Sequence, residues 1–306
     1  MLSMAIATAV LWSSLAQAQV LPIVKGVPTD AHRAVVGLGL DIGEQRFVAC
    51  TGTLITPRLV LTAAHCGDDL DLDVMVDVAS AYFGRSAEDV DEVIGFVDGW
   101  VHPDRAGLEY DFGIVELQRD APVEPSPLWV DPIDEEWVGG SLTAVGWGQS
   151  GDGEDTAGVK RSAELTIDRV SELFIISFEE TNPGGVLPCD GDSGGPLYRL
   201  SEGQWIQVAV HSWGEDPCGD RSGSSRIDVG LDWIGSVVQE VHGTDDLCEA
   251  NGRYGDGVCD LGCPESDSDC GKSEPKACGC STQSRGAHLA WWIMGFLWCR
   301  IRVRGR

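Results

Sequence analysis

The chain has 306 residues, and its 21 lysine and arginine residues against 49 aspartate and glutamate residues give a formal net charge of −28. A body this acidic repels nucleic acid and anionic lipid head groups, which argues against both as partners. Hydrophobic residues form 43% of the chain, too large a share for a disordered acidic protein. The composition therefore indicates a folded, soluble, acidic body.

The first 18 residues have the pattern of a signal peptide. An apolar stretch over residues 4–15 precedes Ala-Gln-Ala at 16–18, which matches a cleavage site for export. Because no basic residue precedes the stretch, a buried N-terminal helix is the alternative. We predict a signal peptide over residues 1–18. Export suits the 11 cysteines of the chain, since closely spaced cysteines form disulfides in oxidising compartments.

Residues 23–242 have the pattern of an all-β domain. Short apolar runs alternate with glycine, proline and aspartate through most of this range. One segment near its end differs, because its apolar residues recur at helical spacing, namely Leu231, Ile234, Val238 and Val241. We predict one β-domain of ordinary length for a barrel fold, closed by a single helix.

Residues 243–270 form a smaller module rich in cysteine and aspartate. They have too few apolar residues to bury a core, so crosslinks or a metal ion must hold them. The four cysteines, which allow three pairings, are Cys248, Cys259, Cys263 and Cys270. Four carboxylates interleave with them and are candidate Ca²⁺ ligands, namely Asp256, Asp260, Asp267 and Asp269. The alternative is a disulfide-bonded acidic spacer without a metal.

The C-terminus is basic and has three parts. After a linker over residues 271–277, residues 278–306 contain Cys278-Gly279-Cys280, a tryptophan-rich apolar run and alternating arginines over 300–306. The apolar run of about 12 residues is shorter than the ~20 that span a bilayer as a helix. This arrangement resembles the C-terminal sorting tail of myxobacterial surface proteins. The resemblance implies removal of the tail by a membrane peptidase and a place on the cell surface, and a plain tail anchor is the alternative.

Three other segments contain residue types that together make a hydrolytic site, namely residues 61–66, 110–117 and 189–197. A serine hydroxyl is a weak nucleophile and needs a base, and histidine suits that role because its pKa lies near working pH. A buried carboxylate holds the imidazole in one tautomer and stabilises the imidazolium. Glycines beside the serine permit a tight turn that points backbone N–H groups at an oxyanion. These roles fit His65, Asp111 and Ser193.

Taken alone, the Gly-Asp-Ser-Gly-Gly run over residues 191–195 also fits the nucleophile elbow of an α/β-hydrolase. That fold expects the chain order serine, acid, histidine and a parallel sheet. Here the order is histidine, aspartate, serine, and the pattern is all-β. The three segments together therefore favour a different fold with the same chemistry.

The segments TAAHC, DFGIVEL and GDSGGPL resemble the three signature segments of the trypsin/chymotrypsin-like serine endopeptidases, and the resemblance covers about residues 23–242. It implies two six-stranded antiparallel β-barrels with the active site between them, and no cofactor for catalysis. It assigns His65 as general base, Asp111 as the group that orients it and Ser193 as nucleophile. The backbone amides of Gly191 and Ser193 become the oxyanion hole.

The same resemblance implies two disulfides, Cys50–Cys66 and Cys189–Cys218. It also implies an activation pair, in which cleavage frees the Ile23 amine and this amine binds Asp192. Residues 19–22 would then form a short propeptide. Because Pro22 rather than a basic residue precedes Ile23, the sequence does not identify the protease that makes the activating cut.

The specificity pocket departs from that of trypsin. Where trypsin-like relatives have an aspartate that binds substrate lysine or arginine, this chain has Leu187, followed by Pro188. An apolar base leaves a bound cation unpaired, so we predict preference for an apolar or small side chain. The resemblance makes Ser212, Trp213 and Gly214 a wall of this pocket.

The sequence therefore predicts a secreted, surface-attached serine endopeptidase that acts as a monomer on proteins or peptides. The alternative is a catalytically weak or dead protease scaffold that acts as a surface binding protein.

Overall fold

The computed structural model describes residues 23, 26–43, 45–69, 78–150, 157–182, 184–215 and 218–270. The predicted signal peptide, propeptide (19–22), linker (271–277) and tail (278–306) lie outside the described residues. The described residues belong to one compact unit. Among the helices in this part of the chain, none is long and apolar enough to cross a membrane.

The first half of the domain is a closed antiparallel barrel. Its strand order is β2-β3-β4-β7-β6-β5. The strands are β2 (Val35–Ile42), β3 (Gln45–Leu54), β4 (Leu59–Thr62), β5 (Ala79–Gly84), β6 (Val90–Val101) and β7 (Gly113–Leu117). Strand β4 is buried along its whole length because both its faces meet apolar side chains. A short helix, α1 (His65–Asp69), follows it.

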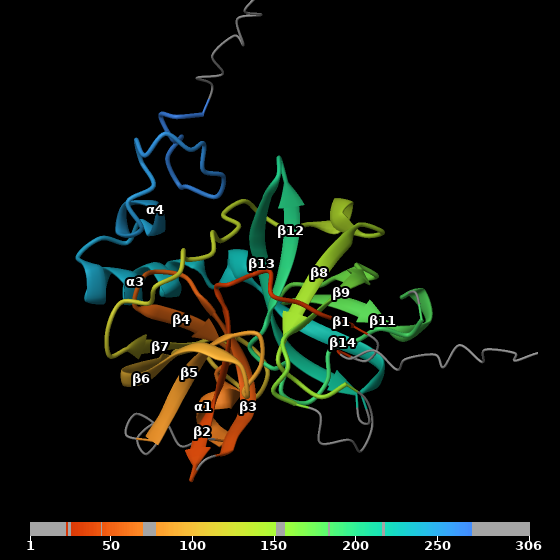
Figure 1. Ribbon diagram of the computed structural model, residues 1–306. Helices are drawn as coiled ribbons and strands as arrows, with labels where there is room; N and C mark the ends of the chain where they lie inside the picture. Colours follow the sequence, from red (N-terminus) through yellow and green to blue (C-terminus); the bar gives the residue numbers. More distant parts are fainter. Residues whose placement is uncertain are drawn as a thin grey trace, which may run out of the picture. The chain divides into compact units, whose positions relative to one another are not determined.

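The second half is an eight-stranded antiparallel sheet beside the barrel (Figure 1). In spatial order its strands are β1 (Val27–Pro28), β9 (Arg161–Thr166), β8 (Ser141–Gly146), β12 (Pro196–Ser201), β13 (Gln204–Glu215), β14 (Gly219–Arg226), β11 (Phe174–Phe178) and β10 (Arg169–Val170). The two edge strands have only two residues each, which leaves six main strands. The all-β, trypsin-like fold class is therefore confirmed, with a closed barrel in the first half only.

The predicted closing helix is present as α3 (Leu231–His242). It buries Ile234, Val237 and Val238 against the core of the first barrel, as the helical spacing requires. Gly243 ends it in the left-handed conformation (φ 80°), and its N–H donates to the Gln239 carbonyl. Three short 3₁₀ helices, η1 (Glu135–Trp137), η2 (Glu179–Thr181) and η3 (Ile227–Val229), complete the domain.

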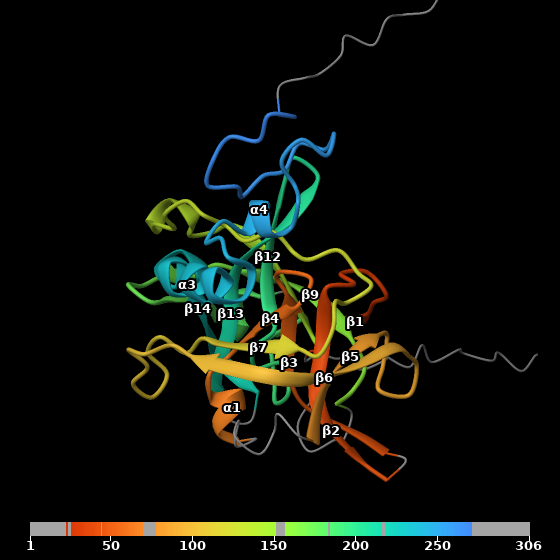
Figure 2. The same ribbon diagram turned by 90° about the vertical axis from the view of Figure 1, so that its left-hand side faces the viewer.

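The Cys/Asp-rich module packs on the protease domain instead of hanging free. It begins with helix α4 (Leu247–Ala250), and its disulfides are Cys248–Cys263 and Cys259–Cys270. Figure 2 shows the module at the end of the β12–β13 hairpin. There the side-chain amide of Gln204 donates to Cys259 O (2.6 Å) and accepts from Leu261 N (3.0 Å).

Two further hydrogen bonds attach the module to other parts of the domain. Asn251 Nδ2 donates to Ile55 O in the first barrel (2.9 Å), and Arg253 donates to Pro125 O in the segment between the barrel and the second sheet (2.6 Å). The module therefore links both halves of the domain and the segment that joins them.

Replacing Gln204 with leucine is expected to lower the free energy of unfolding by about 2 kcal/mol, because two partly buried backbone groups lose their partner. Urea denaturation of the two proteins measures the difference. The control is Gln45→Leu, at an exposed position of β3. Equal losses in the two variants would mean that the Gln204 contacts do not hold the module.

Candidate active site

His65 and Asp111 meet because β4 and β7 are neighbours in the first barrel. Thr62 at the end of β4 pairs with Gly113 at the start of β7. His65 Nδ1 lies 2.7 Å from Asp111 Oδ2, and the His65 backbone N–H donates to Oδ1 at 2.8 Å. Ser212 Oγ, from β13 of the second sheet, donates to the same Oδ2 at 2.6 Å. Three donors from both halves of the domain thus converge on one carboxylate.

The Asp111 carboxylate is 0% exposed, and its environment favours the charged form. Burial alone would raise its pKa, but hydrogen bonds from His65 and Ser212 outweigh burial and lower the pKa of Asp111 below its ordinary value. Arg105 Nε also lies 3.9 Å from Oδ1. Asp111 is therefore a fixed, ionised acceptor.

Ser193 lies in a tight turn that packs against the end of β4 beside His65. Ser193 O is 3.6 Å from the disulfide sulfur of Cys66, and a Cβ on Gly194 would come within 2.0 Å of Thr62 Oγ1. In the described part of the chain, Ser193 Oγ and His65 Nε2 form no hydrogen bond. Such bonds are often long without substrate and tighten in the complex.

The two backbone amides beside the nucleophile are free to bind an oxyanion. The amides on either side of the Ser193 amide have partners, because Asp192 N donates to Cys189 O and Gly194 N donates to His211 O. The N–H groups of Gly191 and Ser193 donate to none of the residues that the structure describes. Gly191 has φ +88°, a left-handed conformation that glycine adopts at low cost. The turn thus has the donor arrangement of an oxyanion hole.

Comparisons with known proteins agree with this geometry. A family model described as Trypsin matches residues 23–234. The chain belongs to the trypsin family. The matched region is a serine endopeptidase domain.

Three trypsin-family relatives show how far the likeness extends. Spermosin of Halocynthia roretzi is 28% identical over 233 residues, which cover 67% of this chain and 58% of that protein. A trypsin of Saccharopolyspora erythraea is 28% identical over 201 residues, which cover 60% of this chain and 82% of that protein. Glucanase inhibitor protein 1 of Phytophthora sojae is 28% identical over 229 residues, which cover 70% of this chain and 87% of that protein. This chain thus spans less than two thirds of the length of Spermosin.

Asp192 and Ile23 are both buried in this trypsin-family domain. The Asp192 carboxylate accepts from Gly148 N (2.8 Å) and Cys189 N (2.9 Å). Ile23 is 1% exposed and belongs to the apolar cluster of the second sheet. In the unprocessed chain Ile23 N is part of a peptide bond and carries no charge. Burial raises the pKa of Asp192 to about 7, although the two amides and the charge of Arg161 act to lower it.

This raised pKa predicts a pH-dependent stability of the unprocessed chain. Because the folded state holds the Asp192 proton more tightly than the unfolded state, stability falls as pH rises from about 4 to about 7, by about 4 kcal/mol for this group. Asp192→Asn lacks this titrating group, so its free energy of unfolding should rise relative to that of the wild type across that pH range. Denaturation at several pH values measures the gain. Asp131→Asn, at an exposed aspartate that does not contribute to the Asp192 pKa, is the control, and a gain equal in both variants would contradict the assignment.

The residues predicted for the specificity pocket lie around the Cys189–Cys218 disulfide. Leu187 is buried in the apolar cluster of the second sheet. Ser212 faces Asp111, as described above. A Cβ on Gly214 would lie 3.7 Å from Pro188 O, so the predicted wall lies beside the segment that follows Leu187. Trp213 packs edge-to-face on Phe174.

The sequence motifs did not single out His211, which lies next to the triad. It precedes Ser212 in β13, is 4% exposed and has no hydrogen-bond partner for Nδ1. Burial, followed by the charge of His65, lowers the pKa of His211 to about 3, so it is neutral at physiological pH. A lone histidine without a motif around it gives no sequence signal for such a position.

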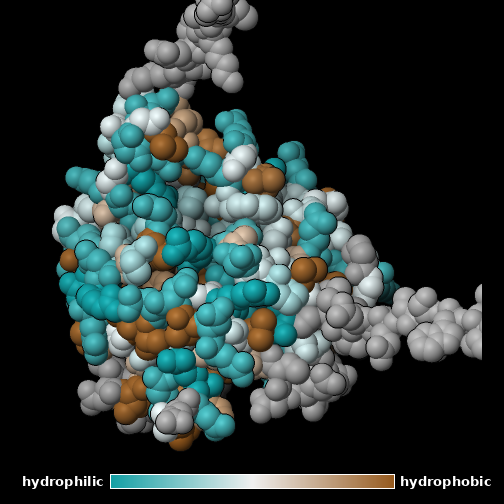
Figure 3. Space-filling model, viewed as in Figure 1, coloured by the Kyte–Doolittle hydropathy of each residue, from teal (hydrophilic) through white to brown (hydrophobic). Residues whose placement is uncertain are grey.

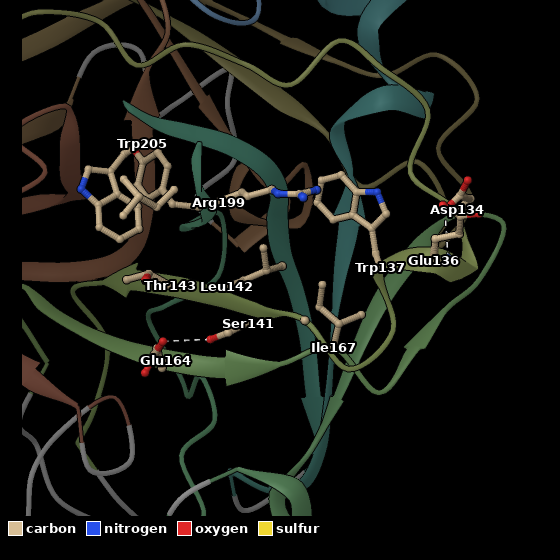
Figure 4. Close-up of a pocket in the computed structure, with 13 residues that line it drawn as sticks. Asp134, Glu136, Trp137, Ser141, Leu142, Thr143, Glu164, Ile167, Arg199 and Trp205 are labelled. Atoms are coloured by element: carbon tan, nitrogen blue, oxygen red, sulfur yellow. Dashed lines mark hydrogen bonds between the residues drawn. The ribbon is translucent and has the colours of Figure 1, made fainter. Parts of the chain in front are cut away.

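The hollow drawn in Figure 4 is separate from this site. It has a volume of about 510 Å³, lies on the second sheet and contains none of the triad residues. Arg199 extends over Trp137, with its guanidinium carbon 4.1 Å from the ring centre, and Trp205 lies at the other end. The Arg199 charge is therefore partly covered by an indole face.

Three of the module's four candidate calcium ligands accept from backbone N–H groups, and the fourth, Asp260, lies 3.8 Å from Arg253 Nε. Asp267 accepts from Asp260 N and Asp269 N, and Asp269 also accepts from Gly257 N. Asp256 accepts from Val258 N. Among the described residues, no group of three or more His, Cys, Asp or Glu side chains is placed to hold a metal ion. Calcium binding by the module therefore stays a prediction.

Proposed function

We propose that the protein hydrolyses peptide bonds of proteins or peptides through an acyl-enzyme on Ser193. The observation that carries the proposal is the hydrogen bond between His65 Nδ1 and Asp111 beside a turn with two free amides. His65 Nε2 takes the proton of Ser193 Oγ as this oxygen attacks the substrate carbonyl carbon. The amides of Gly191 and Ser193 stabilise the oxyanion that forms.

The rest of the cycle uses the same groups. The imidazolium of His65 gives its proton to the leaving amine, and the C–N bond breaks to leave an acyl ester on Ser193. Water then attacks the ester, His65 takes the water proton and returns it to Ser193 Oγ, and the acid is released. Asp111 remains ionised and holds His65 in the required tautomer.

We propose a non-basic primary specificity, for apolar or small side chains. The burial of Leu187 in an apolar cluster supports it, because a lysine or arginine side chain would bring a charge there without a partner. Pro188 and residues 212–214 would line the sides of the pocket.

We further propose that the protein is exported and becomes active when cleavage frees Ile23, whose amine would bind Asp192. Four disulfides in the described part of the chain suit an oxidising compartment. The tail over residues 278–306 would direct a monomeric protein to the cell surface, where a sorting peptidase removes it. The module would act as a disulfide-bonded brace.

A second candidate is a binding protein built on a protease scaffold. The relative named Glucanase inhibitor protein 1 favours it, since that name describes an inhibitor with the same domain. The free amides at Ser193 favour the enzyme, because a scaffold without catalysis does not need them.

The test is hydrolysis of a peptide panel by protein purified after expression of the full chain, with its N-terminus determined by mass spectrometry. We expect cleavage after apolar or small residues. Cleavage after lysine or arginine would support the endopeptidase function and reject the proposed non-basic specificity. No cleavage by folded protein that begins at Ile23 would favour the scaffold.

A further inference from the structure

A buried threonine of the first barrel, Thr51, forms two hydrogen bonds to the turn that contains Ser193. It follows Cys50 in β3, and its side chain is fully buried. Thr51 Oγ1 donates to Gly191 O at 2.8 Å. Its backbone N–H donates to Ser193 O, also at 2.8 Å. One residue of the first barrel thus binds two carbonyl groups of a turn in the second half of the domain.

The two carbonyls belong to alternate peptide planes of the turn. A peptide unit is planar, so fixing its C=O also fixes the N–H of the following residue. Thr51 holds the plane after Gly191 and the plane after Ser193. The plane between them carries the Ser193 N–H, one of the two free amides. Gly195 N donates to the carbonyl of this middle plane, Asp192 O (2.8 Å), and Thr51 adds to that restraint by holding the planes on both sides.

The Thr51 hydroxyl also has a second partner, from which it accepts a hydrogen bond, and the two bonds together fix its orientation. Trp147 N donates to Thr51 Oγ1 at 2.9 Å, while the next amide, that of Gly148, donates to the Asp192 carboxylate at 2.8 Å. Without the hydroxyl, Gly191 O and Trp147 N would lose their partner in a buried environment. Asp192 N, in the same peptide plane as Gly191 O, would keep its bond to Cys189 O (2.9 Å), so this plane would be held by one hydrogen bond where it now has two.

We propose that Thr51 is a positioning residue for the transition state, whose hydroxyl holds the turn so that the free amides point at the oxyanion. This inference rests on the proposed endopeptidase function. Thr51 acts through Gly191 and Ser193 and does not touch substrate. Its contribution is therefore larger in the transition state than in the ground state, because the oxyanion exists only in the former.

The test compares three variants of the protein purified after expression of the full chain. Thr51→Val keeps the shape and removes the hydroxyl, while Thr51→Ser keeps the hydroxyl. Thr56→Val is the matched control, because Thr56 is equally buried and its hydroxyl accepts from Leu59 N, but it lies away from the turn. The burst of nitrophenol from a nitrophenyl ester counts working active sites, so that unfolded protein does not affect kcat.

We expect Thr51→Val to lower kcat about tenfold with KM within about twofold, since removing an oxyanion donor itself costs about 10²–10³. The inhibition constant of a peptide aldehyde, which forms a tetrahedral adduct, should rise by the same factor as kcat/KM falls. Thr51→Ser should restore most of kcat.

Three results would overturn the inference. They are an unchanged kcat in Thr51→Val, an equal loss in Thr56→Val, or a rise in KM with no change in kcat. In each case the hydrolysis by the wild type leaves the proposed function intact. A wild type that hydrolyses no peptide overturns both the function and the role of Thr51.

Discussion

Replacing Ser193 with alanine is expected to lower kcat by about 10⁶, since loss of the nucleophile disables the triad as a unit. The change removes one oxygen from a side chain that makes no hydrogen bond within the described residues, so folding should be preserved. Hydrolysis of one good peptide by equal amounts of the two proteins measures the effect. Thermal unfolding of both proteins checks that the variant has the same fold.

A second readout separates this loss from a contaminating protease. A serine-directed organophosphorus reagent forms a covalent adduct with an activated hydroxyl, and mass spectrometry locates it. The adduct should form on the wild type and on Ser236→Ala, which replaces a helix serine whose hydroxyl donates to Trp233 O. It should be absent from Ser193→Ala. A Ser193→Ala protein that retains more than about a hundredth of the activity would reject Ser193 as nucleophile.

Much of the fold could be predicted from the sequence, because its signals are local. The helical spacing of Ile234 and Val238, followed by Gly243, defines α3 and its end. Short apolar runs indicate the long strands. The two-residue edge strands β1 and β10 are too short to form a pattern, and they bring the six strands that the family resemblance implies to eight in the second sheet.

Features that depend on contacts between distant segments could not be predicted. Four cysteines in the module allow three pairings, and only the path of the chain selects Cys248–Cys263 with Cys259–Cys270. Alternating aspartates suggest metal ligands, but oxygens of Asp267 and Asp269 accept backbone N–H groups once the loops are folded. The docking of the module on Gln204 likewise has no local signal.

The site divides in the same way. His65, Asp111 and Ser193 stand in short segments whose residue types carry the chemistry, so the sequence can nominate them. Thr51 is a single threonine in a strand, and its two bonds to the turn cross 140 residues of chain or more. The direction of its hydroxyl is visible only when both halves of the domain are in place.

The second large effect concerns the acid of the triad, where Asp111→Asn is expected to lower kcat by about 10⁴ while the fold is kept. The hydrogen bonds decide which way the asparagine amide must point. His65 N donates to Oδ1 at 2.8 Å, so the amide oxygen has to remain at that position. The amide NH₂ therefore takes the position of Oδ2, which lies 2.7 Å from His65 Nδ1.

That NH₂ donates to Nδ1 and so places the imidazole proton on Nε2. His65 then has no lone pair with which to accept the Ser193 proton, although all atoms are nearly where they were. The Ser212 hydroxyl can rotate to accept from the new NH₂, which limits the cost to stability. Asp104→Asn, at an exposed carboxylate of the same loop, is the matched control and should keep kcat within about twofold. If Asp111→Asn lowers kcat by less than about tenfold, the tautomer argument fails and Asp111 is not the orienting acid.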